Sequence, residues 1–268
     1  MTHIIRSTLW LLFFGSILLA WIWLYQMTAM MGIDLIGRSA PMSMDTMGND
    51  TMQSDQMGQG MAMSMTEFGP LFAMWAIMMA AMMLPTMIPT LRAYEDLIQS
   101  ADGSRAGWGG VILGYFIAWI VFAALITGVQ IGLHRTGVVD MLGVAQSTVV
   151  SAALLVVVGL FQFSRTKEIC HGVCHSPMTY FLGNWKTGFG GGLRMGLGLG
   201  AFCVGCCWGF MALGFVGGVM NLLWMGLATL FMVVEKLPDI GHRVTKPMGV
   251  LLIAGGVLLG FSPLVTGG

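Results

Sequence analysis

The chain contains several long stretches that are apolar and almost free of charge. The longest lies between Arg194 and Glu235, with no charged side chain in between. A helix needs about 20 apolar residues to cross the hydrocarbon core of a bilayer. Charged residues make up 9% of the sequence, whereas an ordinary soluble domain carries about 25%. The pattern therefore predicts an all-α fold, a polytopic membrane helix bundle.

Hydropathy predicts about seven transmembrane helices. They cover residues 8–31, 68–88, 109–131, 148–163, 193–216, 219–234 and 248–263. The first stretch ends in Trp21, Trp23 and Tyr25 without a small-residue cleavage site, so we interpret it as a retained anchor rather than a signal peptide. The predicted organisation is an N-terminal transmembrane anchor at 1–31, a flexible extracytoplasmic loop at 32–66, and a six-helix membrane core at 67–268.

The basic residues predict the orientation, because cytoplasmic loops carry an excess of Lys and Arg. With the N-terminus inside, the outer segments hold only Arg38 and Arg135. The inner segments hold Arg6, Arg92, Arg105, Arg165, Lys167, Lys186, Lys236, Arg243 and Lys246. We therefore expect a cytoplasmic N-terminus, an external C-terminus, and a multi-pass protein of a bacterial or archaeal inner membrane.

The predicted outer loop is rich in methionine, and 26 methionines occur in the whole chain. Residues 41–65 read PMSMDTMGNDTMQSDQMGQGMAMSM, with the candidate ligands Met42, Met44, Met47, Met61, Met63 and Met65. The segment has no apolar periodicity and no core to fill, so it is expected to be disordered without a ligand. Thioethers are soft ligands that select Cu(I). The loop predicts binding of Cu(I) or Ag(I); the alternative is a solvated linker.

A second methionine pattern follows within residues 74–87. Its two ridges at i+4 spacing are Met74, Met78 and Met82, and Met79, Met83 and Met87. Buried methionine ordinarily fills a core, but the neighbouring methionine loop favours a thioether ladder with Met78, Met82 and Met83 as candidate metal ligands. Pro85 removes the helical hydrogen bond to the carbonyl of Ala81 and predicts a kink.

Three cysteines share one helix face within residues 201–211, AFCVGCCWGFM. At about 100° per residue, Cys206 and Cys207 fall on either side of Cys203 within one arc. The opposite face carries a stripe of glycines, Gly198, Gly205 and Gly209. Such a stripe lets a neighbouring helix approach closely. Thiolates are soft metal ligands. The alternatives are small packing residues, which buried cysteines resemble, or a redox-active C-x-x-C pair.

The segment CHGVCH forms a second cysteine cluster, predicted to lie on the inner side. On a helix, Cys170, His171, Cys174 and His175 lie on one side and could bind one metal, with Zn²⁺ as an alternative to copper. The plain alternative is a reduced cysteine pair beside two loop histidines. The five cysteines are an odd number, which argues against a disulfide framework.

The predicted spans lack the residues that several functional classes of membrane protein need. No predicted span has an interior charged residue or a central histidine, and the polar residues left are Gln130 and Asn221 with Arg194 and Glu235 at span ends. Charge-relay transport and bis-histidine haem binding are therefore not expected. For Glu235 we favour a structural role, such as pairing with Lys236, over metal binding. The net charge is zero, so no nucleic-acid partner is expected.

Residues 68–242 contain a series of motifs in a characteristic order. These are Trp75, Met78 to Met83 and Pro85; Gly114 and Tyr115; Cys170, Cys174 and Pro177; Gly196 to Met211 with its C-x-x-C-C-W core; and Met220, Asn221, Trp224, Met225, Glu235 and Lys236. In these motifs the chain resembles an uncharacterised family of predicted metal-binding integral membrane proteins, the domain of unknown function 2182. The resemblance implies a polytopic helical membrane fold and a metal role. The methionine loop, His171 and His175 depart from the family pattern.

Together these features predict a Cu(I)-binding integral membrane protein of a copper-handling system, with no catalytic residues. Its expected partners are the lipid bilayer, copper ions, and either a periplasmic copper chaperone or a membrane copper enzyme. Two hypotheses compete with this one. The first is a membrane thiol oxidoreductase that uses the Cys203–Cys206 pair with quinone. The second is an assembly subunit of a copper enzyme.

Overall fold

The computed structural model describes residues 2–37, 67–101, 103–140, 142–237 and 241–266. Over these residues the fold is helical, which confirms the predicted class. The helices are α1 (Thr2–Met30), α3 (Phe68–Met83), the 3₁₀ turn η1 (Pro85–Met87), α4 (Ile88–Ser100), α5 (Arg105–Arg135), α6 (Thr148–Phe161), α7 (Arg165–His175), α8 (Pro177–Asn184), α9 (Gly188–Ala212), α10 (Gly214–Gly217), α11 (Leu222–Glu235) and α12 (Gly241–Thr266). The candidate ligands of the methionine loop, Met42 to Met65, lie outside the described residues.

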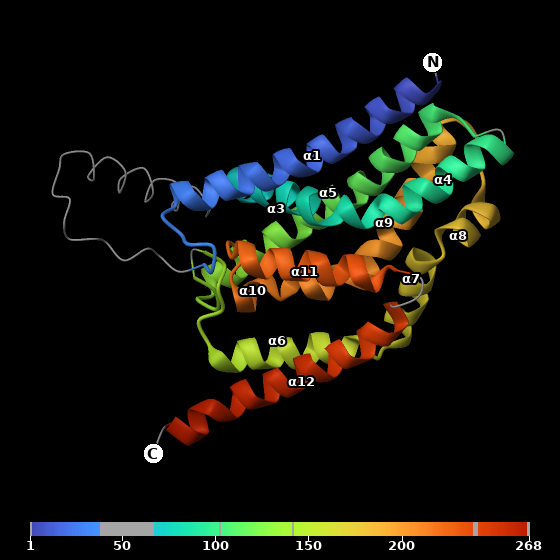
Figure 1. The fold of residues 1–268 in the computed structure, drawn as a ribbon. Coiled ribbons are helices and arrows are strands. Elements are labelled where there is room, and N and C mark those ends of the chain that lie inside the picture. Colours follow the sequence, from blue (N-terminus) through green and yellow to red (C-terminus); the bar gives the residue numbers. More distant parts are fainter. Residues whose placement is uncertain (1, 38–66, 102, 141, 238–240, 267–268) are drawn as a thin grey trace, which may run out of the picture.

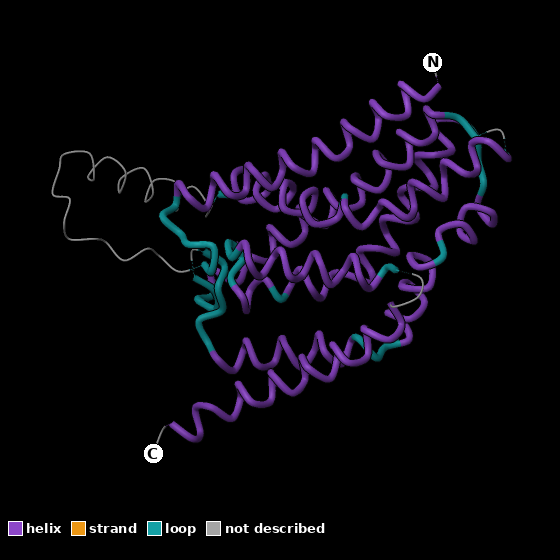
Figure 2. Tube along the Cα trace, in the orientation of Figure 1, coloured by secondary structure: helices purple, strands orange, loops and turns teal. Residues whose placement is uncertain are grey.

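The long helices run in roughly the same direction and are connected mainly at the two ends of the bundle (Figure 2). In Figure 1, α1 lies along one side of the bundle, α6 and α12 lie side by side along the other, and α11 runs between them. The N-terminus and the C-terminus lie at opposite ends.

Five helical stretches are long and apolar enough to cross a membrane. They are Ile4–Met30, Phe68–Ile98, Arg105–Arg135, Gly188–Gly217 and Arg243–Phe261. The fourth predicted span corresponds to α6, which is followed by α7 after a bend of 63°, and the two together make a sixth candidate. The sixth predicted span corresponds to α11, which has only 14 residues. The described residues therefore contain five full-length candidates, or six with the bent pair, rather than seven.

The centre of the bundle is a close pair formed by α5 and α9. A Cβ atom added at Gly192 or Gly196 of α9 would collide with the backbone carbonyl of Gly107 or Val111 on α5. A Cβ atom at Gly114 would in turn meet the backbone of α9. Glycines at such spacing allow two helix backbones to approach closely. This contact fixes the depth and rotation of α9, and hence the position of its cysteines.

The glycine stripe predicted from the sequence packs against other helices. Gly205 faces the Cys170 side chain of α7, whose sulfur would lie 2.9 Å from a Cβ atom added there. Gly209 similarly faces Val158 of α6, and Gly198 faces the hydroxyl of Tyr180 on α8. The predicted close approach is therefore confirmed. It allows α7 to reach α9.

Pro85 interrupts the second helix, as predicted. Helix α3 ends at Met83, η1 occupies the next turn, and α4 continues from Ile88. The carbonyl of Ala81, which loses its helical donor to Pro85, accepts a hydrogen bond of 3.1 Å from Nε1 of Trp21 on α1. The tryptophan therefore satisfies a backbone group that the proline leaves without its usual partner.

Replacing Trp21 with Phe is expected to destabilise the protein by about 1–3 kcal/mol, since the Ala81 carbonyl loses this donor. Thermal unfolding in detergent, followed by circular dichroism, measures the change. The matched control is Trp23→Phe, because Trp23 is an exposed residue of the same helix. Equal unfolding temperatures for the two variants would contradict this role of Trp21.

Candidate metal centre

The three cysteines of α9 lie in the interior, as their shared helix face predicts. Cys203, Cys206 and Cys207 are 0%, 2% and 1% exposed. The Sγ atoms of Cys206 and Cys207 are 3.3 Å apart. All five cysteines of the chain are free thiols in the structure.

A fourth thiol joins them from a different helix. Cys174 of α7 is buried, and its Sγ lies 3.9 Å from the Sγ of Cys206. The sulfurs of Cys174, Cys203 and Cys206 all lie within 4.8 Å of one another. We call these three residues the thiol cluster, with Cys207 beside it. Three soft ligand atoms converging in a buried position are a suitable donor set for a soft metal ion.

The bend between α6 and α7 brings Cys174 to this place. Ser164 begins α7 as its N-cap, because its hydroxyl oxygen accepts a hydrogen bond from the backbone N–H of Lys167. Helix α7 then leaves the axis of α6 at 63° and packs against α9. At the contact, Gly205 leaves room for Cys170. Cys174, one turn further along α7, contacts Cys206.

The structure divides the predicted group of Cys170, His171, Cys174 and His175. Among the described residues, the group of three or more His, Cys, Asp or Glu ligand atoms within 4.8 Å of one another is the thiol cluster, and it includes only Cys174 of the four. Nε2 of His171 lies 2.9 Å from the backbone carbonyl oxygen of Glu235. Cys170 is only partly buried. Cys174 thus belongs with the α9 cysteines instead of a separate inner site.

Polar groups from three further elements surround Cys203. Nζ of Lys236, which follows α11, donates to Sγ of Cys203 over 3.1 Å and to Oγ1 of Thr86 over 2.9 Å. The hydroxyl of Tyr115 on α5 lies 3.0 Å from the same sulfur and 3.3 Å from Oγ1 of Thr86. The break at Pro85 places Thr86 here, within η1. An ammonium group in direct contact with sulfur stabilises a thiolate.

A buried ion pair lies on the other side of the cluster. Lys167 and Glu235 side chains are 1% and 2% exposed, and their charged atoms are 2.9 Å apart. Nζ of Lys167 also donates to the backbone carbonyl of Cys206 over 2.8 Å, and Thr245 of α12 donates to Oε1 of Glu235 over 3.0 Å. The predicted spans themselves carry no interior charge, but residues just beyond their ends bring a buried ion pair into the bundle. Glu235 forms an ion pair, which agrees with the structural role predicted for it, but its partner is Lys167 rather than Lys236.

The sequence did not indicate these buried lysines, because the hydropathy pattern places Lys167 and Lys236 in segments between the predicted spans. The bend after α6 turns Lys167 into the bundle, and α11 ends early enough for Lys236 to reach Cys203. Buried charges in such surroundings are costly unless they are paired. Their position beside the thiols marks them as part of the site.

The methionines of α3 are buried near this site. Met78, Met82 and Met83 are 4%, 3% and 1% exposed. Helix α3 packs against α5 and α11, and Thr86, three residues after Met83, contacts both Tyr115 and Lys236. The end of the methionine stripe therefore borders the elements that surround the thiol cluster. The role of these three methionines as metal ligands remains a prediction.

The comparison with known families decides the assignment. A family model described as PpoB2, copper chaperone, matches residues 72–259, which is well over half of the chain. The chain belongs to the PpoB2 copper chaperone family. No curated protein and no solved structure matches it.

The PpoB2 match includes all four buried cysteines and the residues around them. Thiolates are soft ligands that select Cu(I), so the donor set of the cluster agrees with the copper role in the family description. The methionine loop at 41–65 lies outside the matched region. A role in copper handling therefore rests on both the family and the cysteine cluster.

Proposed function

We propose that this PpoB2 family protein binds Cu(I) at the thiol cluster, within a membrane-embedded helix bundle, and moves, buffers or delivers copper across or within the inner membrane. The observation that carries the proposal is the convergence of three buried free thiols from two helices within 4.8 Å. The family membership points to the same metal.

The donor set favours Cu(I) over Zn²⁺. Structural zinc sites are almost always tetrahedral with four protein ligands, whereas the cluster offers three thiols at mutual ligand distance. If two of the three thiols are ionised, the two thiolates and one Cu(I) carry a net charge of −1, which the ammonium group of Lys236 at Cys203 offsets. Ag(I) has the same charge and softness and should bind at the same place.

The surface of the bundle supports membrane insertion. Large apolar side chains are exposed along several helices, including Leu11 (72%) on α1, Leu125 (64%) on α5, Leu230 (61%) on α11 and Leu258 (72%) on α12. Soluble monomers rarely expose apolar patches that extend over a whole face. In the proposed arrangement the methionine loop captures copper outside, and Met78, Met82 and Met83 relay it toward the thiol cluster.

The copper content of the purified protein tests this proposal. The protein lacking residues 41–65 is loaded with Cu(I) without oxygen in detergent, and metal is counted by mass spectrometry. We expect Cys203→Ser and Cys174→Ser to lose the bound copper, because each removes one sulfur of the cluster. Cys170→Ser is the matched control, since Cys170 lies on α7 one turn from Cys174 and outside the cluster. Equal copper content in all variants would refute the site.

The competing function is that of a membrane thiol oxidoreductase, which the short distances between the sulfurs also favour. Neighbouring thiols at 3.3 Å and 3.9 Å could form a disulfide and pass electrons to quinone. The sulfurs of the predicted redox pair, Cys203 and Cys206, lie within 4.8 Å of each other. If this pair is redox-active, its thiols would alkylate only after reduction, and quinone would reoxidise them to the disulfide. A copper site instead protects the thiols from alkylation when Cu(I) is bound.

A further inference from the structure

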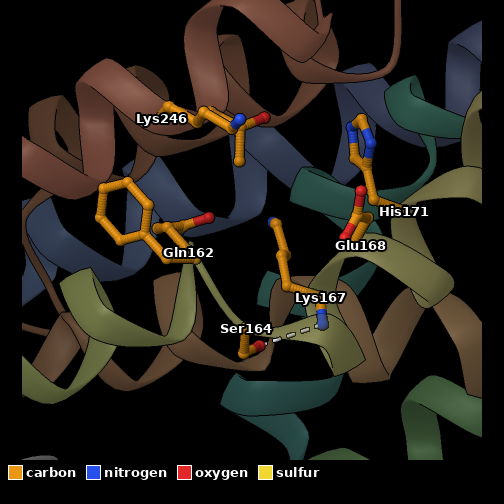
Figure 3. Close-up of a pocket in the computed structure, with 8 residues that line it drawn as sticks. Gln162, Ser164, Lys167, Glu168, His171 and Lys246 are labelled. Atoms are coloured by element: carbon orange, nitrogen blue, oxygen red, sulfur yellow. Dashed lines mark hydrogen bonds between the residues drawn. The ribbon is translucent and has the colours of Figure 1, made fainter.

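A polar pocket of about 330 Å³ opens where the bend between α6 and α7 meets the start of α12. Its volume lies within the range of about 300–1,000 Å³ that is typical of small-molecule sites. Figure 3 shows Gln162 and Lys246 across the pocket from Glu168 and His171, with Lys167 between them. The pocket forms no part of the thiol cluster.

The pocket and the thiol cluster share one wall. Lys167 and Thr245 line the pocket, and both bind the carboxylate of Glu235. Lys167 also donates to the backbone carbonyl of Cys206. The buried Lys167–Glu235 pair therefore connects the lining of the pocket to the backbone of Cys206, a residue of the thiol cluster. A molecule in the pocket would lie beside this ion pair.

The lining of the pocket has the chemistry to recognise a small zwitterionic peptide. Gln162 is 5% exposed, and its buried Oε1 atom has no hydrogen-bond partner among the described residues. Buried polar atoms are nearly always paired, so this oxygen calls for an N–H donor such as a peptide amide. Lys246 and Glu168 supply one cation and one anion for a carboxylate and an ammonium group.

We propose that this pocket binds a small thiol peptide that carries both a carboxylate and an ammonium group, and that the peptide exchanges Cu(I) with the thiol cluster. The inference rests on the proposed function, because the exchanged ion is the copper of that site. In the exchange, a Cu–S bond to a cysteine is replaced by a Cu–S bond to the peptide. The proton of the peptide thiol passes to the cysteine sulfur, and no electron is transferred.

The position of the pocket agrees with this ligand. The corner between α6 and α7 and the start of α12 lie toward the same end of the bundle as the N-terminus (Figure 1), which is the predicted cytoplasmic end. The cytosol is kept reducing by glutathione, a thiol tripeptide with the required charged groups. Since peptide and protein both offer thiolates, copper can pass between equally soft ligands.

Binding of S-methylglutathione to the copper-free protein tests the pocket alone, because this probe cannot ligate copper through a thiolate. Isothermal titration calorimetry in detergent should show saturable binding. We expect Gln162→Leu and Lys246→Glu each to weaken it about tenfold or more, as expected for the loss of a buried hydrogen bond or a charge pair. Lys186→Glu is the matched control, because Lys186 is exposed and outside the pocket. No binding, or equal affinity in Gln162→Leu, would overturn the inference.

The rate of copper transfer tests the exchange. Copper-loaded protein is mixed with increasing glutathione, and the transfer rate should reach a plateau in the wild type but rise linearly and more slowly in Gln162→Leu. With 2-mercaptoethanol, which lacks the charged groups, both proteins should behave alike. If copper binds but glutathione transfer never saturates, the exchange site is wrong while the proposed function stands. If the protein binds no copper but still binds S-methylglutathione, the proposed function fails and the pocket stands.

Discussion

Replacing Lys167 with Met is expected to lower the free energy of unfolding by about 3–5 kcal/mol, because the substitution leaves a buried charge without its partner. Glu235 is 2% exposed at its side chain, and Lys167 supplies the only cation that the structure describes within ion-pair distance of it. Lys167 also donates to the backbone carbonyl of Cys206, which would lose this donor. The change should therefore loosen the contact of α7 with both α9 and α11.

The double variant Lys167→Met with Glu235→Gln should recover most of the lost stability, because it removes both charges together. Replacing a buried ion pair by neutral groups is often close to neutral, whereas removing one partner is costly. Thermal unfolding of both variants and the wild type in detergent measures this difference. Lys186→Met serves as the control for loss of a lysine at the surface. A single variant as stable as the wild type would show that Glu235 does not depend on Lys167.

The parts of the fold that follow from local chemistry could be predicted from the sequence. The spacing of Cys203, Cys206 and Cys207 places them on one face of any helix, and in the structure they are buried together. Pro85 must interrupt a helix because it lacks a backbone N–H and clashes with the preceding turn. Gly205 and Gly209 were expected to admit a close neighbour, and they do. Each of these predictions depends only on residues within one helix.

The composition of the site could not be predicted, since it depends on contacts between helices. Cys174 is distant from Cys206 in sequence, and only the bend after α6 brings their sulfurs to 3.9 Å. Lys167 and Lys236 look like ordinary loop lysines because charge in a sequence does not show which way a chain turns. One signal was present: Tyr115 and Lys236 both belong to the motifs that carry the family resemblance, and both contact Cys203.

The contact between the ammonium group of Lys236 and a sulfur of the thiol cluster yields the second large effect. Replacing Lys236 with Met is expected to weaken Cu(I) binding by at least about 30-fold, which corresponds to about 2 kcal/mol, the lower end of the cost of removing one partner of a buried charge pair. Lys236 donates to Sγ of Cys203 over 3.1 Å and is 7% exposed. Without it, a complex of two thiolates and Cu(I) would carry an uncompensated negative charge in the interior.

A competition titration with a chromophoric Cu(I) chelator measures the affinity of each variant. Lys236→Arg keeps the positive charge and should retain most of the affinity, whereas Lys236→Gln keeps a hydrogen-bond donor without the charge and should resemble Lys236→Met. This pair separates electrostatic stabilisation of the thiolate from the mere loss of a contact with Thr86 and Cys203. If Lys236→Met bound Cu(I) as tightly as the wild type while Cys203→Ser lost it, the bound sulfurs would not need the ammonium charge. In that case, the charge balance proposed for the site would have to be abandoned, although the sulfur ligands would remain.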